Sequence, residues 1–294
     1  MSLKEKNRTG DKNRRKEKLI EIFFLLLACI SIIAVVVICI FLFANGLPAI
    51  LEIGVKELLF GTKWRPGESL YGIFPMIIGS IYATIGAILL GVPIGILTAV
   101  FMSKICPKKL YKVLKPAMEL LAGIPSIVYG FFALVVIVPI IRQLFPGNGL
   151  SLFTACILLG IMILPTIIGV AESAIRAVPD SYYEGALALG ATRERSLFFV
   201  VVPAAKSGIM TAVVLGLGRA LGEAMAIAMV AGGAVNLPLP FNSVRFLTTL
   251  IVGEMSYSSG LHREVLFTIG LVLFAFILFV NIFLTRMIKK GEAE

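Results

Sequence analysis

Residues 181–203 read SYYEGALALGATRERSLFFVVVP and lie between two long apolar segments. Pro179 cannot continue the preceding helix, and Ser181 followed three residues later by Glu184 predicts a capping box that begins a new helix. Gly190 is expected to end this helix after about two turns, because glycine tolerates the left-handed backbone at a helix C-terminus. The stretch therefore predicts a short, polar-edged helix between membrane spans.

A second short helix is expected directly after the first. Thr192 can cap this helix, and Pro203 marks its far boundary. Gly185, Ala188 and Ala191 leave one flank of the pair without bulky side chains, which favours close approach by the surface of another protein. We interpret the helix pair as a coupling segment that contacts a partner.

The same stretch resembles the EAA loop of binding-protein-dependent ATP-binding cassette importers. Glu184, Gly185 and Ala186 stand where the loop has its Glu-Ala-Ala triplet, with glycine in place of the first alanine, and Gly190 and Pro203 stand at the expected distances beyond. In that family the loop docks into a cleft on a separate ATPase subunit. The resemblance implies that these five residues couple the chain to an ATPase. The alternative for Glu184 is a role as a helix cap only.

The apolar composition indicates an integral membrane protein. Hydrophobic residues make up 59% of the chain, whereas soluble domains contain about 45–50%. A helix needs about 20 apolar residues to cross the hydrocarbon core, and proline breaks are tolerated where neighbouring helices satisfy the freed backbone groups. Six stretches are long enough, which predicts an all-α polytopic protein with six transmembrane helices: 22–44, 77–102, 117–141, 150–171, 208–231 and 265–287.

The net charge of +10 is distributed asymmetrically between the two sides of the predicted bundle. Twenty of the 27 Lys and Arg residues lie on the side of the termini, six lie on the opposite side, and Arg219 lies inside a span. The positive-inside rule therefore predicts that both termini and the coupling segment are cytoplasmic. This placement favours an orientation signal with lipid contacts over nucleic-acid binding.

These patterns predict five regions along the chain. They are a basic cytoplasmic tail at 1–21, a first transmembrane helix at 22–44, an external segment at 45–71, a permease domain at 72–287 and a cytoplasmic tail at 288–294. The external loops are expected to form a docking surface for a binding protein. Trp64 and Tyr71 are expected in the aromatic belt at the membrane surface.

Residue types for catalysis are scarce. The sequence has no G-x-x-x-x-G-K-[ST] phosphate-binding loop, so ATP must be hydrolysed by another subunit. The single histidine, His262, excludes a multi-histidine metal site and a buried nucleophile triad, and we expect it in a solvated loop. We therefore assign no catalytic residue, metal site or bound cofactor, and expect a transport subunit rather than an enzyme. A secondary transporter or channel is the alternative class, since six spans with glycine and proline breaks suit it too.

Arg219 and Glu223 lie in the fifth predicted span. A buried arginine costs at least about 2.5–3.5 kcal/mol on insertion scales, so it should face a polar cavity or a partner. The four-residue spacing puts both side chains on one helix face, where they can form a structural pair. Alternatively, the guanidinium binds a tetrahedral anion and the carboxylate accepts a hydrogen bond from an anion that keeps a proton, as phosphate does.

Further residues are weaker candidates for a substrate pathway. Ser126 and Tyr129 follow a proline break where irregular backbone can line a cavity, with a packing kink as the alternative. Ser80 and Thr84 lie one turn apart in the second span, although helical hydroxyls usually bond their own backbone. A stripe of small residues in the fifth span predicts close packing against another span. The stripe consists of Gly218, Gly222 and Ala226.

Four longer segments together resemble the PstC family, one of two permease subunits of phosphate-specific ATP-binding cassette importers. The segments are GIFPMIIGSIYAT, GVPIGILTAVFMS, KPAMELLAGIPSIVYGFF and GLGRALGEAMAIAMVAGG, and the resemblance covers about residues 72–287. It implies a type I importer permease fold in a bacterial cell (inner) membrane. In the family, the arginine and glutamate of the last segment are implicated in phosphate movement, which implies this role for Arg219 and Glu223.

The resemblance also implies an assembly. The expected partners are a second permease subunit similar to PstA, a cytoplasmic ATPase dimer similar to PstB that uses ATP and Mg, and an external phosphate-binding protein similar to PstS. The lipid bilayer surrounds the complex, and no nucleic acid is expected. Permeases for molybdate or sulfate are more remote relatives, so another oxyanion is the alternative substrate.

Overall fold

The computed structural model describes the backbone of residues 3–292 and the side chains of residues 17–18 and 20–286. This part is almost entirely helical, which confirms the all-α expectation. The α-helices are α1 (Leu3–Ile53), α2 (Val55–Phe60), α3 (Phe74–Val100), α4 (Lys108–Gly123), α5 (Ser126–Phe132), α6 (Val138–Leu144), α7 (Leu152–Arg176), α8 (Asp180–Ala188), α9 (Arg193–Ser196), α10 (Val202–Ala204), α11 (Lys206–Gly222), α12 (Met225–Val230), α13 (Leu247–Glu254) and α14 (Gly260–Glu292). The π-helical segments are η2 (Phe101–Ile105), η3 (Ala133–Ile137) and η4 (Leu197–Val201), and η1 (Pro66–Glu68) is a 3-10 turn. The antiparallel strands β1 (Trp64–Arg65) and β2 (Leu70–Tyr71) form a small hairpin.

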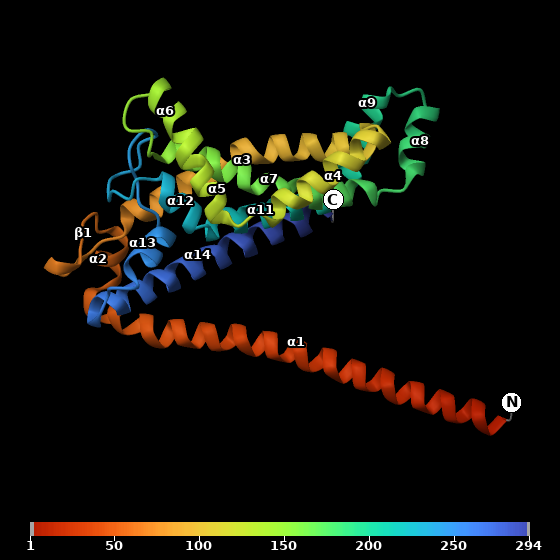
Figure 1. The fold of residues 1–294 in the computed structure, drawn as a ribbon, viewed down its shortest axis with the longest axis horizontal. Helices are drawn as coiled ribbons and strands as arrows, with labels where there is room; N and C mark the ends of the chain where they lie inside the picture. Colours follow the sequence, from red (N-terminus) through yellow and green to blue (C-terminus); the bar gives the residue numbers. More distant parts are fainter. Residues whose placement is uncertain (1–2, 293–294) are drawn as a thin grey trace.

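The bundle is centred on α7, which packs against both α3 and α11. Helix α14 packs against α1, α11 and α13, and α12 packs against α5. Figure 1 shows α8 and α9 projecting at one end of the bundle, while β1, α2 and α13 lie at the other. We call these the coupling end and the hairpin end.

The first helix diverges from the bundle (Figure 1). Near its C-terminal end, the Gly46 carbonyl accepts a hydrogen bond of 2.6 Å from the Thr268 hydroxyl of α14, and Phe41 packs edge-on against Phe267. Along residues 20–38, its apolar side chains are exposed on all sides within this chain. Such a surface is compatible with lipid or a partner subunit, and not with water. The basic residues 4–16 of the expected tail have side chains outside the described ones.

Membrane spans agree with the sequence expectation in four of six places. Within the described residues, five helical segments are long and apolar enough to cross a membrane: Ile20–Ile53, Phe74–Ile105, Ser126–Leu144, Leu152–Arg176 and Gly260–Arg286. A sixth crossing results if Arg193–Ala204 and Lys206–Gly222, which are bent by 71°, form one span.

The third span differs from its predicted bounds of 117–141. Helix α4 ends at Gly123 because Ile124 and Pro125 adopt extended backbone, with ψ angles of 128° and 139°. Pro125 disfavours helical backbone in the residue before it. The apolar crossing helix therefore begins at Ser126, and α4 is a separate helix on the coupling side of this break.

The structure of the coupling segment agrees in part with the predictions from the sequence. Gly190 has a φ of 86°, and the N–H groups of Gly190 and Ala191 bond back to the carbonyls of Leu187 and Ala186, which is a Schellman motif. The Thr192 hydroxyl accepts a hydrogen bond from the Arg195 N–H at 3.3 Å, as a helix cap should. Both local predictions are confirmed.

Another prediction for this segment is wrong. The expected capping box of Ser181 and Glu184 is not formed, because Pro179 rather than Ser181 is the N-cap of α8, which begins at Asp180. The boundary predicted at Pro203 is confirmed to within one residue. The helical stretch from Arg193 ends at Ala204, and the bend before α11 follows at Ala205.

Candidate functional site

Arg219 lies in the last turn of α11 and is partly buried. Its Nη1 donates to the hydroxyl oxygen of Thr166 on α7 at 3.4 Å, the long end of the hydrogen-bond range. Among the described side chains, Arg219 makes no ion pair with a carboxylate. The hydrogen-bond partner of Arg219 among the described side chains is therefore a neutral hydroxyl from a neighbouring span.

Glu223 does not share a helix face with Arg219, contrary to the expectation. Helix α11 ends at Gly222, and Glu223 has extended backbone with a ψ of 132°. Its Oε1 instead accepts a hydrogen bond of 2.9 Å from the N–H of Ala226, at the start of α12. Its backbone carbonyl accepts the Thr248 hydroxyl at 2.8 Å. The predicted continuous fifth span of 208–231 is thus broken between α11 and α12, beside Arg219.

Tyr129 holds the break in the third span. Its hydroxyl, from a side chain that is 8% exposed, donates 2.7 Å to the Leu121 carbonyl, near the C-terminal end of α4. This bond satisfies one of the carbonyls that a helix end leaves without an intrahelical partner. Ser126 begins α5 directly after the break and is partly buried. The phenol and hydroxyl therefore flank the irregular backbone that the sequence indicated.

Ser80 and Thr84 take part in local packing on α3. The Thr84 hydroxyl bonds the Ser80 carbonyl of its own helix at 2.7 Å, which is the ordinary behaviour of a helical hydroxyl. The Ser80 hydroxyl accepts the Leu247 N–H at 3.3 Å, at the start of α13. Their roles as pathway residues stay predictions.

The small-residue stripe of the fifth span does not pack as a unit. Ala226 is fully buried and lies against Gly130 of α5, where an added Cβ would come within 2.8 Å of the Ala226 Cα. A Cβ at Gly218 or Gly222 would meet nothing within 4 Å, and the same holds for Gly169 of α7. The expectation of close packing is therefore confirmed at Ala226 and wrong within this chain at the two glycines.

The coupling segment presents an open surface. Helix α8 contains no buried residue, and Leu189, which follows it, is 91% exposed. Glu184 and Gly185 are exposed, and Ala186 is partly buried. Space beyond Gly185 and Gly190 is empty, since a Cβ at either position would meet nothing within 4 Å.

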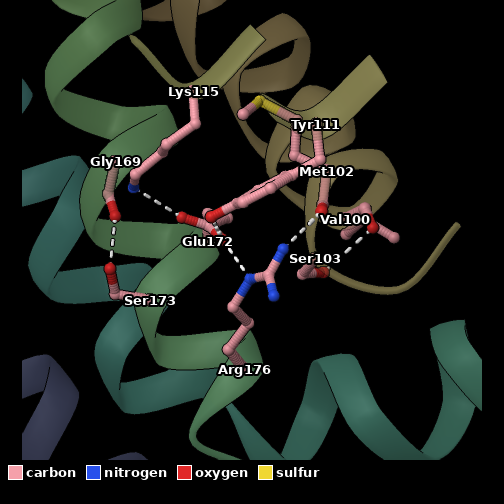
Figure 2. A network of polar contacts seen from close by, with 9 residues as sticks. All are labelled: Val100, Met102, Ser103, Tyr111, Lys115, Gly169, Glu172, Ser173 and Arg176. Carbon is pink, nitrogen blue, oxygen red and sulfur yellow. Dashed lines mark hydrogen bonds and ion pairs between the residues drawn. The ribbon is translucent and has the colours of Figure 1, made fainter. Parts of the chain in front are cut away.

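A buried carboxylate near this segment was not anticipated from the sequence. Figure 2 shows Glu172, which is 1% exposed at the end of α7, surrounded by Tyr111, Lys115 and Arg176. The hydrogen bond and charge of Glu172 raise the pKa of Lys115 above its ordinary value, although burial opposes this shift. A signal existed in the sequence, because a glutamate that directly follows a 20-residue apolar run needs a buried partner.

A second unanticipated carboxylate lies at the hairpin end. Glu254 is 5% exposed and receives the Trp64 indole N–H at 3.1 Å, the Arg245 guanidinium at 2.7 Å and contacts His262 Nε2 at 2.8 Å. Trp64 and Tyr71 are 8% and 4% exposed. Their assignment to the aromatic belt is therefore wrong, and so is a solvated loop for His262, which lies in the first turn of α14. The acceptor Glu254 explains why the Trp64 indole N–H can be buried.

A helical bundle with several apolar crossings, a projecting helix pair and an arginine inside a span is typical of a membrane permease. Residues 91–290 match the family described as "Binding-protein-dependent transport system inner membrane component". The chain belongs to this family. It is accordingly a multi-pass transport subunit rather than an enzyme.

Relatives and solved structures agree with this assignment. The chain is 44% identical over 271 residues to the "Probable ABC transporter permease protein YqgH" of Bacillus subtilis, with 88% of each chain covered. It is 33% identical over 262 residues to the "Phosphate transport system permease protein PstC" of Pasteurella multocida, covering 81% of this chain and 82% of the relative. A bacterial ABC transporter involved in the import of the acidic polysaccharide alginate has a similar structure, with a TM-score of 0.62, 16% identity and coverage of 90% and 95%. The MetNI methionine ABC transporter has a TM-score of 0.57, 23% identity and coverage of 78% and 99%. At these identities the structural likeness shows the importer permease fold.

Proposed function

We propose that this chain is one permease subunit of an ATP-driven importer for inorganic phosphate. The relatives named as phosphate transport permeases support the substrate class. The surroundings of Arg219 supply a chemical reason for an anionic substrate, and they are the observation that carries the proposal. Its guanidinium stands between spans with the Thr166 hydroxyl as a neutral neighbour and without a carboxylate partner among the described side chains.

An arginine in this setting favours an oxyanion. The guanidinium fork matches the oxygens of a tetrahedral anion and keeps its charge at every working pH. The hydroxyl of Thr166 can donate a further hydrogen bond to such an anion. Because a charge inside the membrane is unfavourable without a partner, a passing anion and Arg219 stabilise one another.

Glu223 provides the second element of the proposed pathway. One of its oxygens holds the N–H of Ala226, and the carboxylate can accept a further hydrogen bond through its other oxygen. Phosphate near neutrality carries a proton that can be donated to such an acceptor, whereas sulfate has none. In this proposal Arg219 attracts the anion and Glu223 favours the protonated form. The hydroxyls of Ser126, Tyr129, Ser80 and Thr84 are weaker candidates for the same pathway.

The remaining partners belong to the same proposal. A second permease subunit completes the pathway, and an ATPase dimer that uses ATP and Mg engages Glu184, Gly185, Ala186, Gly190 and Pro203 of the coupling segment. A phosphate-binding protein docks at the hairpin end. In this arrangement both termini are cytoplasmic and the complex lies in the cell membrane.

The test is uptake by the complete complex reconstituted in vesicles. We expect ATP-dependent accumulation of labelled phosphate that is stimulated by the binding protein and is not inhibited by excess sulfate or molybdate. Transport of sulfate or molybdate with exclusion of phosphate would assign the chain to another oxyanion. ATP-independent uptake that follows an ion gradient would place it among secondary transporters.

A further inference from the structure

The buried Glu172 joins three elements at the coupling end. Its Oε1 accepts the Tyr111 hydroxyl at 3.0 Å, and its Oε2 pairs with the Lys115 ammonium at 2.8 Å; both donors come from α4. Its Oε1 also accepts the Nε of Arg176, one turn further along α7. Figure 2 shows the three donors converging on the carboxylate.

Arg176 extends this cluster to the π-helical end of the second span. Its Nη2 donates 3.0 Å to the carbonyl of Met102 in η2, and its guanidinium carbon lies 4.2 Å from the centre of the Tyr111 ring. Lys104 lies two residues after Met102 in η2, and its ammonium pairs with the Asp180 carboxylate at 2.7 Å. This ion pair holds the pKa of Asp180 below its ordinary value. The cluster is thus connected to the first residue of α8, the coupling helix.

Helix α4 depends on these polar contacts for its position. It contains no buried residue, so apolar packing contributes little to holding it against the bundle. In its first half, Tyr111 and Lys115 of α4 donate hydrogen bonds to Glu172. Near the end of α4, the Leu121 carbonyl accepts a hydrogen bond from the Tyr129 hydroxyl. Helix α5, which follows the break, packs in turn against α12, just beyond Arg219 and Glu223 in the broken fifth span.

We propose that Glu172 is a positioning residue that couples movement of α8 to the α4–α5 break and, through the packing of α5 against α12, to the broken fifth span that carries Arg219. The inference rests on the proposed function, because it assumes that an ATPase moves the coupling segment. When α8 and the end of α7 shift, Arg176 and Lys104 shift with them. The buried carboxylate then carries α4 along, and α4 displaces the break that Tyr129 holds.

A buried carboxylate suits this task better than apolar packing. Its four lone-pair positions are directional, and three donors from two helices occupy them, so the relative position of α4 and α7 is restricted. A charged acceptor loses more on separation from its donors than a neutral one does. The clamp therefore stays closed while the attached elements move.

The test compares Glu172→Gln with Glu119→Gln in the complete reconstituted complex. Glutamine keeps the shape of Glu172 and removes its charge, whereas Glu119 is an exposed residue of α4 that makes no hydrogen bond to Glu172. We expect Glu172→Gln to bind the ATPase normally but to lower the phosphate moved per ATP hydrolysed by about two- to thirtyfold, the usual range for residues on a coupling route. Glu119→Gln should keep the wild-type ratio.

The amount of phosphate moved per ATP hydrolysed distinguishes a role in coupling from a role in stability. A residue with a structural role alone would reduce the amount of assembled complex and leave the phosphate moved per ATP unchanged, which would overturn the proposal. If Glu172→Gln fails to assemble, Tyr111→Phe serves in its place, because it removes only one hydrogen bond from the cluster. This variant should lower the same ratio, and a wild-type ratio would count against the proposal.

A double variant tests the clamp itself. Lys115→Gln and Glu172→Gln break the same link, so the two changes together should lower the ratio no further than Glu172→Gln alone. If the effects of the two substitutions on this ratio multiply in the double variant, Lys115 and Glu172 have independent roles and the clamp is refuted. If the wild-type complex transports no phosphate at all, the proposed function fails, whereas normal transport with unaltered variant ratios removes only the role of Glu172.

Discussion

The guanidinium of Arg219 and the hydroxyl of Thr166 come from two different spans and lie 3.4 Å apart. The sequence predicted a carboxylate partner four residues along the same helix. Instead, the break after Gly222 directs Glu223 to the start of α12. Arg219 thereby forms no ion pair among the described side chains, and its hydrogen-bond partner is a neutral hydroxyl.

Arg219→Gln should reduce phosphate uptake by more than about tenfold, because it removes the charged member of a hydrogen bond worth about 1.5–3 kcal/mol. Arg219→Lys should restore uptake only in part, since a point charge cannot match two anion oxygens. Uptake per assembled complex is the measurement, with copurification of the ATPase as the control for folding. Near-normal uptake by the glutamine variant would leave Arg219 with a structural role.

Thr166→Val should raise the phosphate concentration for half-maximal uptake by about two- to twelvefold, the effect of losing one hydrogen bond of 0.5–1.5 kcal/mol. Valine has nearly the same shape, so packing of α7 is preserved. Thr166→Ser retains the hydroxyl and is the matched control. Equal uptake curves for the valine and serine variants would exclude the hydroxyl from the pathway.

Gly190→Asp should produce an inserted permease that no longer couples to its ATPase. A Cβ at this position meets nothing within 4 Å in this chain, so the bundle should fold, but the φ of 86° is strained for a side chain by about 1–2 kcal/mol and the carboxylate projects from the coupling surface. ATPase copurification and stimulated ATP hydrolysis measure the effect. Gly190→Ala, which adds no charge, should be milder. Normal binding and stimulation with aspartate would exclude this surface from coupling.

Residue 67 should be external and residue 291 cytoplasmic, as the charge asymmetry requires. A Cβ at Gly67 meets nothing within 4 Å, so a cysteine there should react freely. After replacement of the native cysteines, an impermeant thiol reagent should label Gly67→Cys in intact cells and leave Gly291→Cys unlabelled until the cells are opened. Labelling of both in intact cells would contradict the predicted orientation.

Glu254→Gln should lower the stability of the purified permease by about 1–3 kcal/mol, because it removes the charged acceptor shared by the buried Trp64 indole and the partly buried Arg245. Thermal unfolding in detergent measures the change. Glu68→Gln is the control, since its ion pair with Arg65 joins side chains that are 59% and 64% exposed. Such surface pairs contribute about 0–1 kcal/mol. A similar melting temperature for both variants would argue against Glu254 as an anchor of the hairpin end.

Local and compositional features could be predicted from the sequence. The apolar runs of the first, second, fourth and sixth spans were located correctly, because crossing the hydrocarbon core depends on length and composition. The left-handed turn at Gly190 and the cap at Thr192 were also correct, since each depends on a few neighbouring residues. The segments that resemble importer permeases indicated the family.

Features that depend on distant residues could not be predicted. Helical spacing alone placed Arg219 and Glu223 on one face, and it carries no information about the Thr248 hydroxyl, 25 residues away, that contacts the broken backbone. The sequence pattern favours the membrane surface for Trp64. Its burial could not be predicted, because its hydrogen-bond acceptor, Glu254, lies 190 residues further along the chain.

The sequence by itself thus determined that this protein is a multi-pass permease with a coupling segment and an arginine inside a span. Only the tertiary structure decided which groups that arginine meets. It also decided that Glu172 of α7 binds Lys115 and Tyr111 of α4, which lie 57 and 61 positions earlier in the chain. The physical reason is the range of the interactions. Spans and turns follow from the hydrophobicity and backbone preferences of adjacent residues, whereas a buried charge is stable only where folding brings remote donors and acceptors to it.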